Sequence, residues 1–206
     1  MKNIDLSLYL VTDNSDDEEK FLKTIEEAIL GGVSIIQIRE KTAETLDFYN
    51  LALKVKEITT KYNIPLIIND RVDIALAIDA DGVHVGQSDM PCDVTRELIG
   101  EDKILGVSAA TISEAKKAEN DGADYIGTGA IFPTTTKKDA DSVSKKELIE
   151  IVNSIDIPVV AIGGINLNNA SELKDTGIAG LSVVSVIMNS DNPKLNSQKL
   201  LKIFNS

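Results

Sequence analysis

The sequence predicts one (β/α)8 barrel over residues 1–206, and three observations favour this fold class. Eight short apolar runs, rich in β-branched residues, recur about every 25 residues, the spacing of one strand and one helix in such a barrel. Segments with helical spacing separate the runs. Each run is almost continuously apolar, as in parallel strands that helices bury on both faces. Eight alternating units therefore indicate a parallel sheet that closes on itself.

The expected elements follow one another along the whole chain. The strands are expected at residues 8–12, 34–38, 65–68, 82–85, 104–107, 125–129, 158–162 and 180–186. The clearest helices are expected at residues 18–30, 46–62 and 113–120, with charged residues outside and Ala, Leu or Ile inside. An open doubly wound sheet competes with the barrel, but the turn after the first strand reads Thr-Asp-Asn-Ser and lacks the glycine fingerprint. The barrel is the better interpretation.

Composition limits the partners and the compartment. The chain is 43% hydrophobic, contains no apolar run long enough to cross a bilayer, and begins with a segment unlike a secretory signal. We therefore expect no membrane association and a cytoplasmic location. A net charge of -12 disfavours nucleic acid, so an anionic ligand would need a local basic site. Cys92 is the only cysteine, which excludes an internal disulfide and favours a packing role.

Two cations follow the second expected strand, at the end where barrel enzymes build their active sites. The period of two along an extended chain places Gln37, Arg39 and Lys41 on one side, while Ile38 points away. Two cations would then converge at the mouth of the barrel. An ordinary ion-pair network that uses Glu40 is the alternative.

Two carboxylates follow the third and fourth expected strands. Asn69 and Asp70 end one strand, and Asp89 follows the next, so the two aspartates are expected near each other. Such a pair suits Mg2+, which takes one or two carboxylates and completes its coordination with phosphate oxygens. The alternative is that each aspartate caps the helix that follows it.

The last three expected strands indicate a second anion site on the same rim. Residues 127–138 combine flexible glycines with four threonines and two lysines, which suit phosphate oxygens. Gly163 and Gly164 follow the seventh strand, and Ser185 lies at the end of the eighth. Loops at these positions form a phosphate cradle in many barrels. Two phosphorylated substrates could meet between the two sites.

His84 is the only histidine and the remaining candidate for proton transfer. A lone histidine on a strand more often joins a polar packing network, and we prefer that interpretation. The sequence shows no Ser/His/Asp or Cys/His arrangement. A rim rich in cations and able to hold a metal suits the departure of diphosphate better than acyl transfer.

These separated motifs, from residues 8–13 to residues 184–185, resemble the thiamine-phosphate synthase family over essentially the whole chain. The resemblance implies a transferase of thiamine biosynthesis that joins hydroxymethylpyrimidine diphosphate to hydroxyethylthiazole phosphate. The thiazole nitrogen would attack the pyrimidine methylene as diphosphate leaves, through a dissociative path. Ala130 departs from the family pattern, in which proline is common before the Ile-Phe-Pro segment.

The resemblance also implies roles for individual residues. The pyrimidine diphosphate would be bound by Gln37, Ile38, Arg39, Glu40, Lys41, Asn69, Ser108 and Lys137. The thiazole phosphate would be bound by Thr134, Thr135, Thr136, Gly164, Val184 and Ser185, and Mg2+ by Asp70 and Asp89. Within this set Arg39, Lys41, Ser108 and Lys137 would be the catalytic residues.

Three alternatives stay open at this level, and so does assembly into a homo-oligomer. A related thiazole tautomerase would bind the thiazole phosphate without needing the combination of Asp70, Asp89 and Lys137. A non-catalytic sensor of a phosphorylated ligand could share the fold. A phosphosugar isomerase would fit the phosphate cradle but would leave the paired aspartates unexplained.

Overall fold

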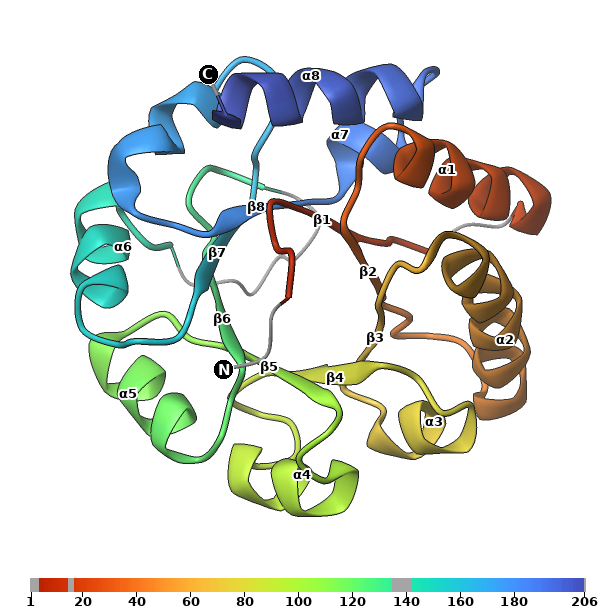
Figure 1. Cartoon of the computed structure of the whole chain (residues 1–206), viewed down its shortest axis with the longest axis horizontal. Helices are drawn as coiled ribbons and strands as arrows, with labels where there is room; N and C mark the ends of the chain where they lie inside the picture. The colour runs from red at the N-terminus through yellow and green to blue at the C-terminus, as the bar shows by residue number, and fades with distance from the viewer. Residues whose placement is uncertain (1–3, 15–16, 135–141, 206) are drawn as a thin grey trace.

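The computed structural model describes residues 4–14, 17–134 and 142–205, and its strands form a closed parallel barrel (Figure 1). The strands are β1 (Leu8–Val11), β2 (Ile35–Ile38), β3 (Leu66–Asn69), β4 (Gly82–Val85), β5 (Ile104–Ser108), β6 (Tyr125–Thr128), β7 (Val159–Ile162) and β8 (Gly180–Val183). Each strand pairs with the next one along the chain, and β8 pairs with β1 to close the barrel. The (β/α)8 fold class is thereby confirmed.

Helices surround the strands, as Figure 1 shows. They are α1 (Glu18–Leu30), α2 (Thr45–Tyr62), α3 (Val72–Ala77), α4 (Cys92–Ile99), α5 (Ile112–Asn120), α6 (Lys145–Val152), the 3-10 segment η1 (Ala170–Thr176), α7 (Ser185–Met188) and α8 (Pro193–Asn205). The three helices expected from the sequence are confirmed to within one residue at each end. The expected eighth strand is too long, because the backbone turns at Val184 and residues 185–188 begin a helix.

Local sequence signals explain where several helices begin. The Asp17 carboxylate accepts a hydrogen bond from the Lys20 amide at the start of α1. Thr111 and Ser144 each form a reciprocal capping box with a glutamate three residues later, at α5 and α6. Such side chains satisfy amide groups that the first turn of a helix leaves without partners. The helices that carry the rim loops are therefore fixed at their ends.

The core has two parts. The larger part lies between the strands and the helices, and the smaller part fills the inside of the barrel with side chains such as Tyr9, Ile35, Ile67 and Tyr125. A barrel of eight strands is narrow, so large inward side chains need small neighbours. Gly106 provides this space, because a Cβ there would lie 2.1 Å from Cζ of Tyr125. Packed side chains close the barrel below the rim.

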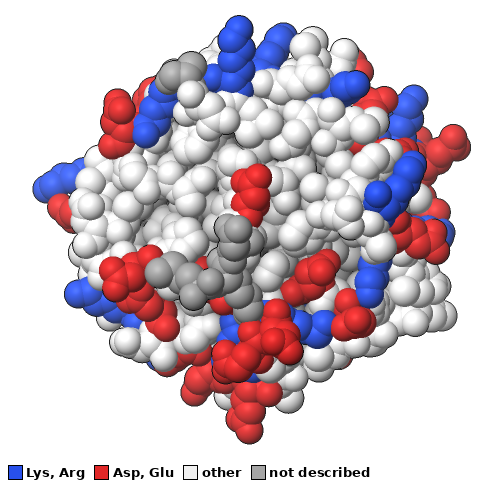
Figure 2. All heavy atoms as spheres, in the orientation of Figure 1, with Lys and Arg blue, Asp and Glu red and all other residues white. Residues whose placement is uncertain are grey.

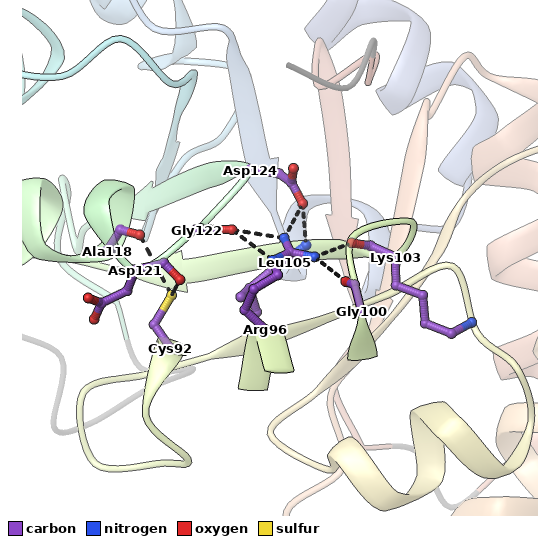
Figure 3. Close-up of polar contacts among 9 residues, drawn as sticks. All are labelled: Cys92, Arg96, Gly100, Lys103, Leu105, Ala118, Asp121, Gly122 and Asp124. Carbon is purple, nitrogen blue, oxygen red and sulfur yellow. Dashed lines mark hydrogen bonds and ion pairs between the residues drawn. The ribbon is translucent and has the colours of Figure 1, made fainter. Parts of the chain in front are cut away.

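A largely buried ion pair connects α4 to the ends of β5 and β6 where those strands begin (Figure 3). The Arg96 guanidinium donates to the Asp124 carboxylate at 2.7 Å and to the carbonyl oxygens of Gly122, Gly100 and Lys103 at 2.7 to 3.0 Å. Asp124 also accepts from the Leu105 amide. The pair therefore joins the loop before β5 to the loop before β6, at the end of the barrel opposite the rim.

Cys92 lies beside this cluster, with its thiol toward the carbonyl oxygens of Ala118 and Asp121 (Figure 3). Burial raises the pKa of the Cys92 thiol to about 11, so the thiol stays protonated near neutral pH. The expected packing role is confirmed.

The face of the molecule in Figure 2 carries charged side chains of both signs. Figure 2 shows basic side chains scattered among acidic ones around the edge of the face that it presents, with mostly uncharged atoms toward the middle. Clustered cations of the kind that neutralise phosphate backbones do not gather on that face. In the described ranges, no helix has the length and hydropathy needed to cross a bilayer.

Candidate active site

A cavity of about 310 Å³ opens at the end of the barrel where the strands terminate. Each of the eight strands contributes at least one lining residue, among them Gln37, Asn69, His84 and Ser108. Most of the residues predicted from the sequence meet here. The predicted residues that line the cavity are Gln37, Arg39, Lys41, Asn69, Asp70, Asp89, Ser108, Thr134, Gly164, Val184 and Ser185.

Two predicted residues lie elsewhere. Ile38 is buried on the outer side of β2, in the core between strands and helices. Glu40 accepts hydrogen bonds from the amides of Thr42 and Ala43 and lines a smaller neighbouring cavity, which Arg39 also lines. Thr135, Thr136 and Lys137 lie outside the described residues, so their roles stay predictions.

The acidic side of the cavity is formed by the loops that follow β3 and β4. The Lys41 ammonium group donates to the Asp70 carboxylate. Burial raises the pKa of Asp70, Lys41 opposes this effect, and the neighbouring Asp89 carboxylate adds to it, so that the pKa lies above its usual range. Two carboxylates and a cation therefore share this corner of the cavity.

The aspartates do not cap helices. The residue before α3 is Arg71 and the residue before α4 is Pro91, and neither helix has a side-chain cap. Instead, Asp89 accepts from the Gly86 amide at 2.8 Å, within the turn that follows β4. Asp70 has a left-handed backbone with φ of 59°, and its amide donates to the His84 carbonyl at 2.8 Å. A local turn thus holds the Asp89 carboxylate at the rim, and a hydrogen bond to β4 holds the backbone of Asp70 there.

The donor set at this corner suits a hard divalent cation. Carboxylate oxygens are preferred ligands of Mg2+, and this ion commonly takes only one or two of them. In the part of the chain that the structure describes, no three His, Cys, Asp or Glu side chains gather into a metal site. A cation held by Asp70 and Asp89 would therefore need further ligands from substrate oxygens and water.

The opposite side of the cavity is formed by the loops after β6, β7 and β8. Gly163 and Gly164 have φ values of 100° and 65°, and a Cβ on Gly164 would lie 2.5 Å from the Pro133 carbonyl oxygen. Only glycine combines this backbone with so close a neighbour. The Gly164 carbonyl accepts from the side chains of Asn166 and Asn169 at 3.1 and 3.0 Å. The sequence analysis missed these two asparagines, which fix the shape of the turn.

A continuous chain of hydrogen bonds crosses the inside of the barrel beneath the cavity. Gln37 donates from Nε2 to the Tyr9 hydroxyl at 2.7 Å, and the Tyr9 and Tyr125 hydroxyls lie 2.7 Å apart. The Tyr125 hydroxyl lies 3.0 Å from Nδ1 of His84, and Nε2 of His84 lies 2.9 Å from Oγ of Ser108. The expectation that His84 joins a polar network is confirmed.

Sequence reasoning missed both tyrosines of this chain. Tyr9 lies two residues before Val11 on β1, and both residues line the cavity, so strand periodicity was an available signal. Tyr125 likewise lies two residues before Gly127, which lines the cavity, but its place beside His84 depends on the register of the neighbouring strands. A further missed residue is Gln87, whose side chain donates to the Ser108 carbonyl at 2.7 Å.

Comparison with known proteins gives a consistent result over nearly the whole chain. The family model described as thiamine monophosphate synthase matches residues 8–187. The thiamine-phosphate synthase of Methanobrevibacter smithii is 74% identical over 204 residues, which cover 99% of this chain and 98% of that protein. The thiamine-phosphate synthase of Clostridium tetani is 56% identical over 205 residues, with 99% and 98% covered.

Solved structures agree with these matches. The thiamine phosphate pyrophosphorylase of Pyrococcus furiosus has a TM-score of 0.87 and 39% identity, and the alignment covers 98% of this chain and 96% of that one. The (S)-3-O-geranylgeranylglyceryl phosphate synthase of Thermoplasma acidophilum has a TM-score of 0.71 at 13% identity, which shows a shared fold alone. The matched length and the level of identity establish that this chain belongs to the thiamine monophosphate synthase family.

Proposed function

We propose that this protein is a thiamine-phosphate synthase that joins hydroxymethylpyrimidine diphosphate to hydroxyethylthiazole phosphate. One observation carries the proposal beyond family membership: a single cavity has cations and paired carboxylates on one side and a glycine turn with Ser185 on the other. Such a cavity can receive a diphosphate and a monophosphate at opposite ends. The two reacting carbon and nitrogen atoms would then meet between them.

The reaction needs one bond to break and one to form. The bond between the pyrimidine methylene and the diphosphate oxygen breaks, and the diphosphate keeps the electron pair. The thiazole ring nitrogen donates its lone pair to the methylene carbon. That nitrogen carries no proton, so the step needs no base at that atom. The protein can therefore assist by positioning both substrates and by stabilising the negative charge of the leaving group.

Cationic side chains would bind the departing diphosphate. Arg39 and Lys41 line the same side of the cavity as Asp70 and Asp89, and we assign Lys137 to the same task from its motif. A Mg2+ ion held by Asp70 and Asp89 would supply positive charge to the diphosphate oxygens when bound. Gln37, Asn69 and Ser108 would position the pyrimidine ring at the inner wall.

The thiazole phosphate would bind at the opposite side. The turn at Gly163 and Gly164 allows close approach of an anion to the backbone, and Ser185 begins the short helix α7 after β8. We assign Val184 to the same subsite, together with Thr134, Thr135 and Thr136. We assign no proton transfer to His84, because its ring nitrogens already face Tyr125 and Ser108.

The test is product formation from the two phosphorylated precursors, with Mg2+ and with a chelator. We expect thiamine phosphate and diphosphate in equal amounts, and loss of both when the chelator is present. Folded protein that binds the thiazole phosphate without forming product would contradict the proposal. Interconversion of thiazole phosphate tautomers in the same assay would favour a tautomerase, and binding without any turnover would favour a sensor.

A further inference from the structure

The chain of hydrogen bonds beneath the cavity has a direction, and the direction follows from which groups can donate. The Gln37 amide nitrogen can only donate, so Tyr9 accepts from it. The Tyr9 hydroxyl hydrogen then points to the Tyr125 oxygen, 2.7 Å away. The Tyr125 hydroxyl, having accepted, donates to Nδ1 of His84 at 3.0 Å. Nδ1 is thereby the unprotonated nitrogen of the ring.

The same reasoning continues to the cavity wall. A neutral imidazole with bare Nδ1 carries its proton on Nε2, and Nε2 lies 2.9 Å from Oγ of Ser108. Ser108 therefore accepts from His84, and its own hydroxyl hydrogen remains to be donated elsewhere. Ser108 lines the cavity, so that hydrogen is available to a ligand.

We infer that Tyr9, Tyr125 and His84 are positioning residues that set the polarity of the pyrimidine subsite. They fix Ser108 as a donor at one end and leave Oε1 of Gln37 as the acceptor at the other. The inference rests on the proposed function for its choice of ligand. A pyrimidine with an exocyclic amino group offers a ring-nitrogen acceptor beside an amino donor, which is the complementary pattern.

The surroundings of these side chains maintain the direction of the hydrogen bonds. Tyr9, Tyr125, Gln37 and His84 are buried, so bulk water does not compete for their hydrogen bonds. Burial raises the pKa of both phenols well above their ordinary value. Each tyrosine therefore keeps its hydroxyl hydrogen, which the chain of hydrogen bonds requires. A Cβ on Gly127 would lie 3.2 Å from Cε1 of His84, so a glycine at this position leaves room for the imidazole ring.

The reversed chain is the only other arrangement in which each hydroxyl donates once and accepts once. It needs the Gln37 amide turned over and the His84 proton moved to Nδ1, and Ser108 would then donate to His84. The cavity would lose its donor at Ser108. The position of one proton on one ring therefore reports the direction of all four hydrogen bonds.

The first measurement is ¹⁵N NMR of ligand-free protein labelled at histidine. Because His84 is the only histidine, the spectrum contains one pair of ring nitrogens. We expect Nε2 to be protonated and Nδ1 to be bare in the wild type. A proton on Nδ1, alone or in addition to Nε2, would overturn the inference whether or not the protein proves to be a synthase.

Two variants interrupt the chain of hydrogen bonds at successive hydroxyl groups. Tyr125→Phe removes the donor to Nδ1, so we expect the two tautomers to mix and the KM for the pyrimidine diphosphate to rise about tenfold. Tyr9→Phe removes the donor that obliges Tyr125 to donate to His84, so we expect the tautomers to mix here too. The KM for the pyrimidine diphosphate should rise about fivefold, because the Gln37 amide also loses its acceptor.

The matched control is Tyr62→Phe, which removes a hydroxyl that donates to Glu26 on the outer helices at 2.8 Å. It should change neither the tautomer nor either KM. The KM for the thiazole phosphate should stay unchanged in all three variants. An unaltered His84 tautomer in folded Tyr125→Phe, or equal rises in both KM values, would contradict a positioning role and indicate general loosening of the barrel.

Discussion

Two pairs of a cation and an aspartate lie at opposite ends of the barrel, and they differ in what completes their hydrogen bonds. Arg96 and Asp124 expose 9% and 14% of their side chains, and backbone groups of two loops and of β5 take up the remaining bonds (Figure 3). Lys41 and Asp70 expose 47% and 19%, and both line the cavity. The first pair is completed by the protein, whereas the second remains open to a ligand.

The two pairs distinguish charged groups that stabilise this fold from charged groups that can bind a ligand. Buried charges need compensation, and the Arg96 cluster obtains it from carbonyl oxygens of its own loops. At the rim, burial raises the pKa of Asp70 and the neighbouring Asp89 carboxylate adds to this effect, an arrangement that a bound cation would relieve. Stability is therefore expected to depend on the end where strands begin, and activity on the end where they finish.

The largest effect is expected for Arg96→Met, which should lower the free energy of unfolding by about 3 kcal/mol, because the largely buried Asp124 loses its cation. KM values of the folded enzyme should change little. Urea unfolding measures the free energy of unfolding. Lys54→Met breaks an exposed pair with Glu18 and should cost no more than about 0.5 kcal/mol. Similar losses of unfolding free energy in the two variants would contradict a special contribution of the Arg96–Asp124 pair to stability.

At the rim, Asp89→Asn should reduce kcat/KM roughly 100-fold and raise the Mg2+ concentration needed for half activity. The asparagine oxygen can still accept from the Gly86 amide, so the unfolding free energy should hardly change. Steady-state kinetics across a Mg2+ titration, with urea unfolding beside it, checks both parts. Full activity in the variant would remove Asp89 from the site.

The raised pKa of Asp70 predicts a pH effect in metal-free protein. At low pH the carboxyl is protonated in both the folded and the unfolded chain. As the pH rises, the Asp70 carboxyl ionises first in the unfolded protein. Its contribution to stability is therefore lost as the pH rises through the pKa that Asp70 has in the folded protein. Wild type should therefore lose stability relative to Asp70→Asn over that range. Parallel stability curves for the two proteins would show that Asp70 is not perturbed.

The smallest effect is expected for Ser185→Ala, which removes one hydroxyl from the proposed phosphate side. The KM for the thiazole phosphate should rise about fivefold, as for the loss of one hydrogen bond to an anion. The KM for the pyrimidine diphosphate should not change, because that substrate occupies the other side. Equal changes in the two values would argue against two separate subsites.

Much of the fold could be predicted from local patterns. The apolar runs locate the strands because burial on both faces leaves a continuous signal. The polar residues that end those runs, such as Gln37, Asp70 and Ser108, line the cavity because parallel strands finish at one edge. The strand predicted at residues 180–186 was too long, because apolar residues continue past Val183 into a helix and hydrophobicity alone does not mark the turn. Cytoplasmic location, assembly into oligomers and the roles of residues 135–137 stay predictions.

Local patterns in the sequence are thus enough to predict the barrel, the polar rim and the family. Which groups meet depends on the folded barrel, since closure brings Tyr9 and Tyr125 together across 116 positions of the chain. The same closure placed His84 between Tyr125 and Ser108, and left Glu40 outside the main cavity. The physical reason is that strand periodicity fixes the side to which a residue points, whereas its partner depends on the register around the closed sheet.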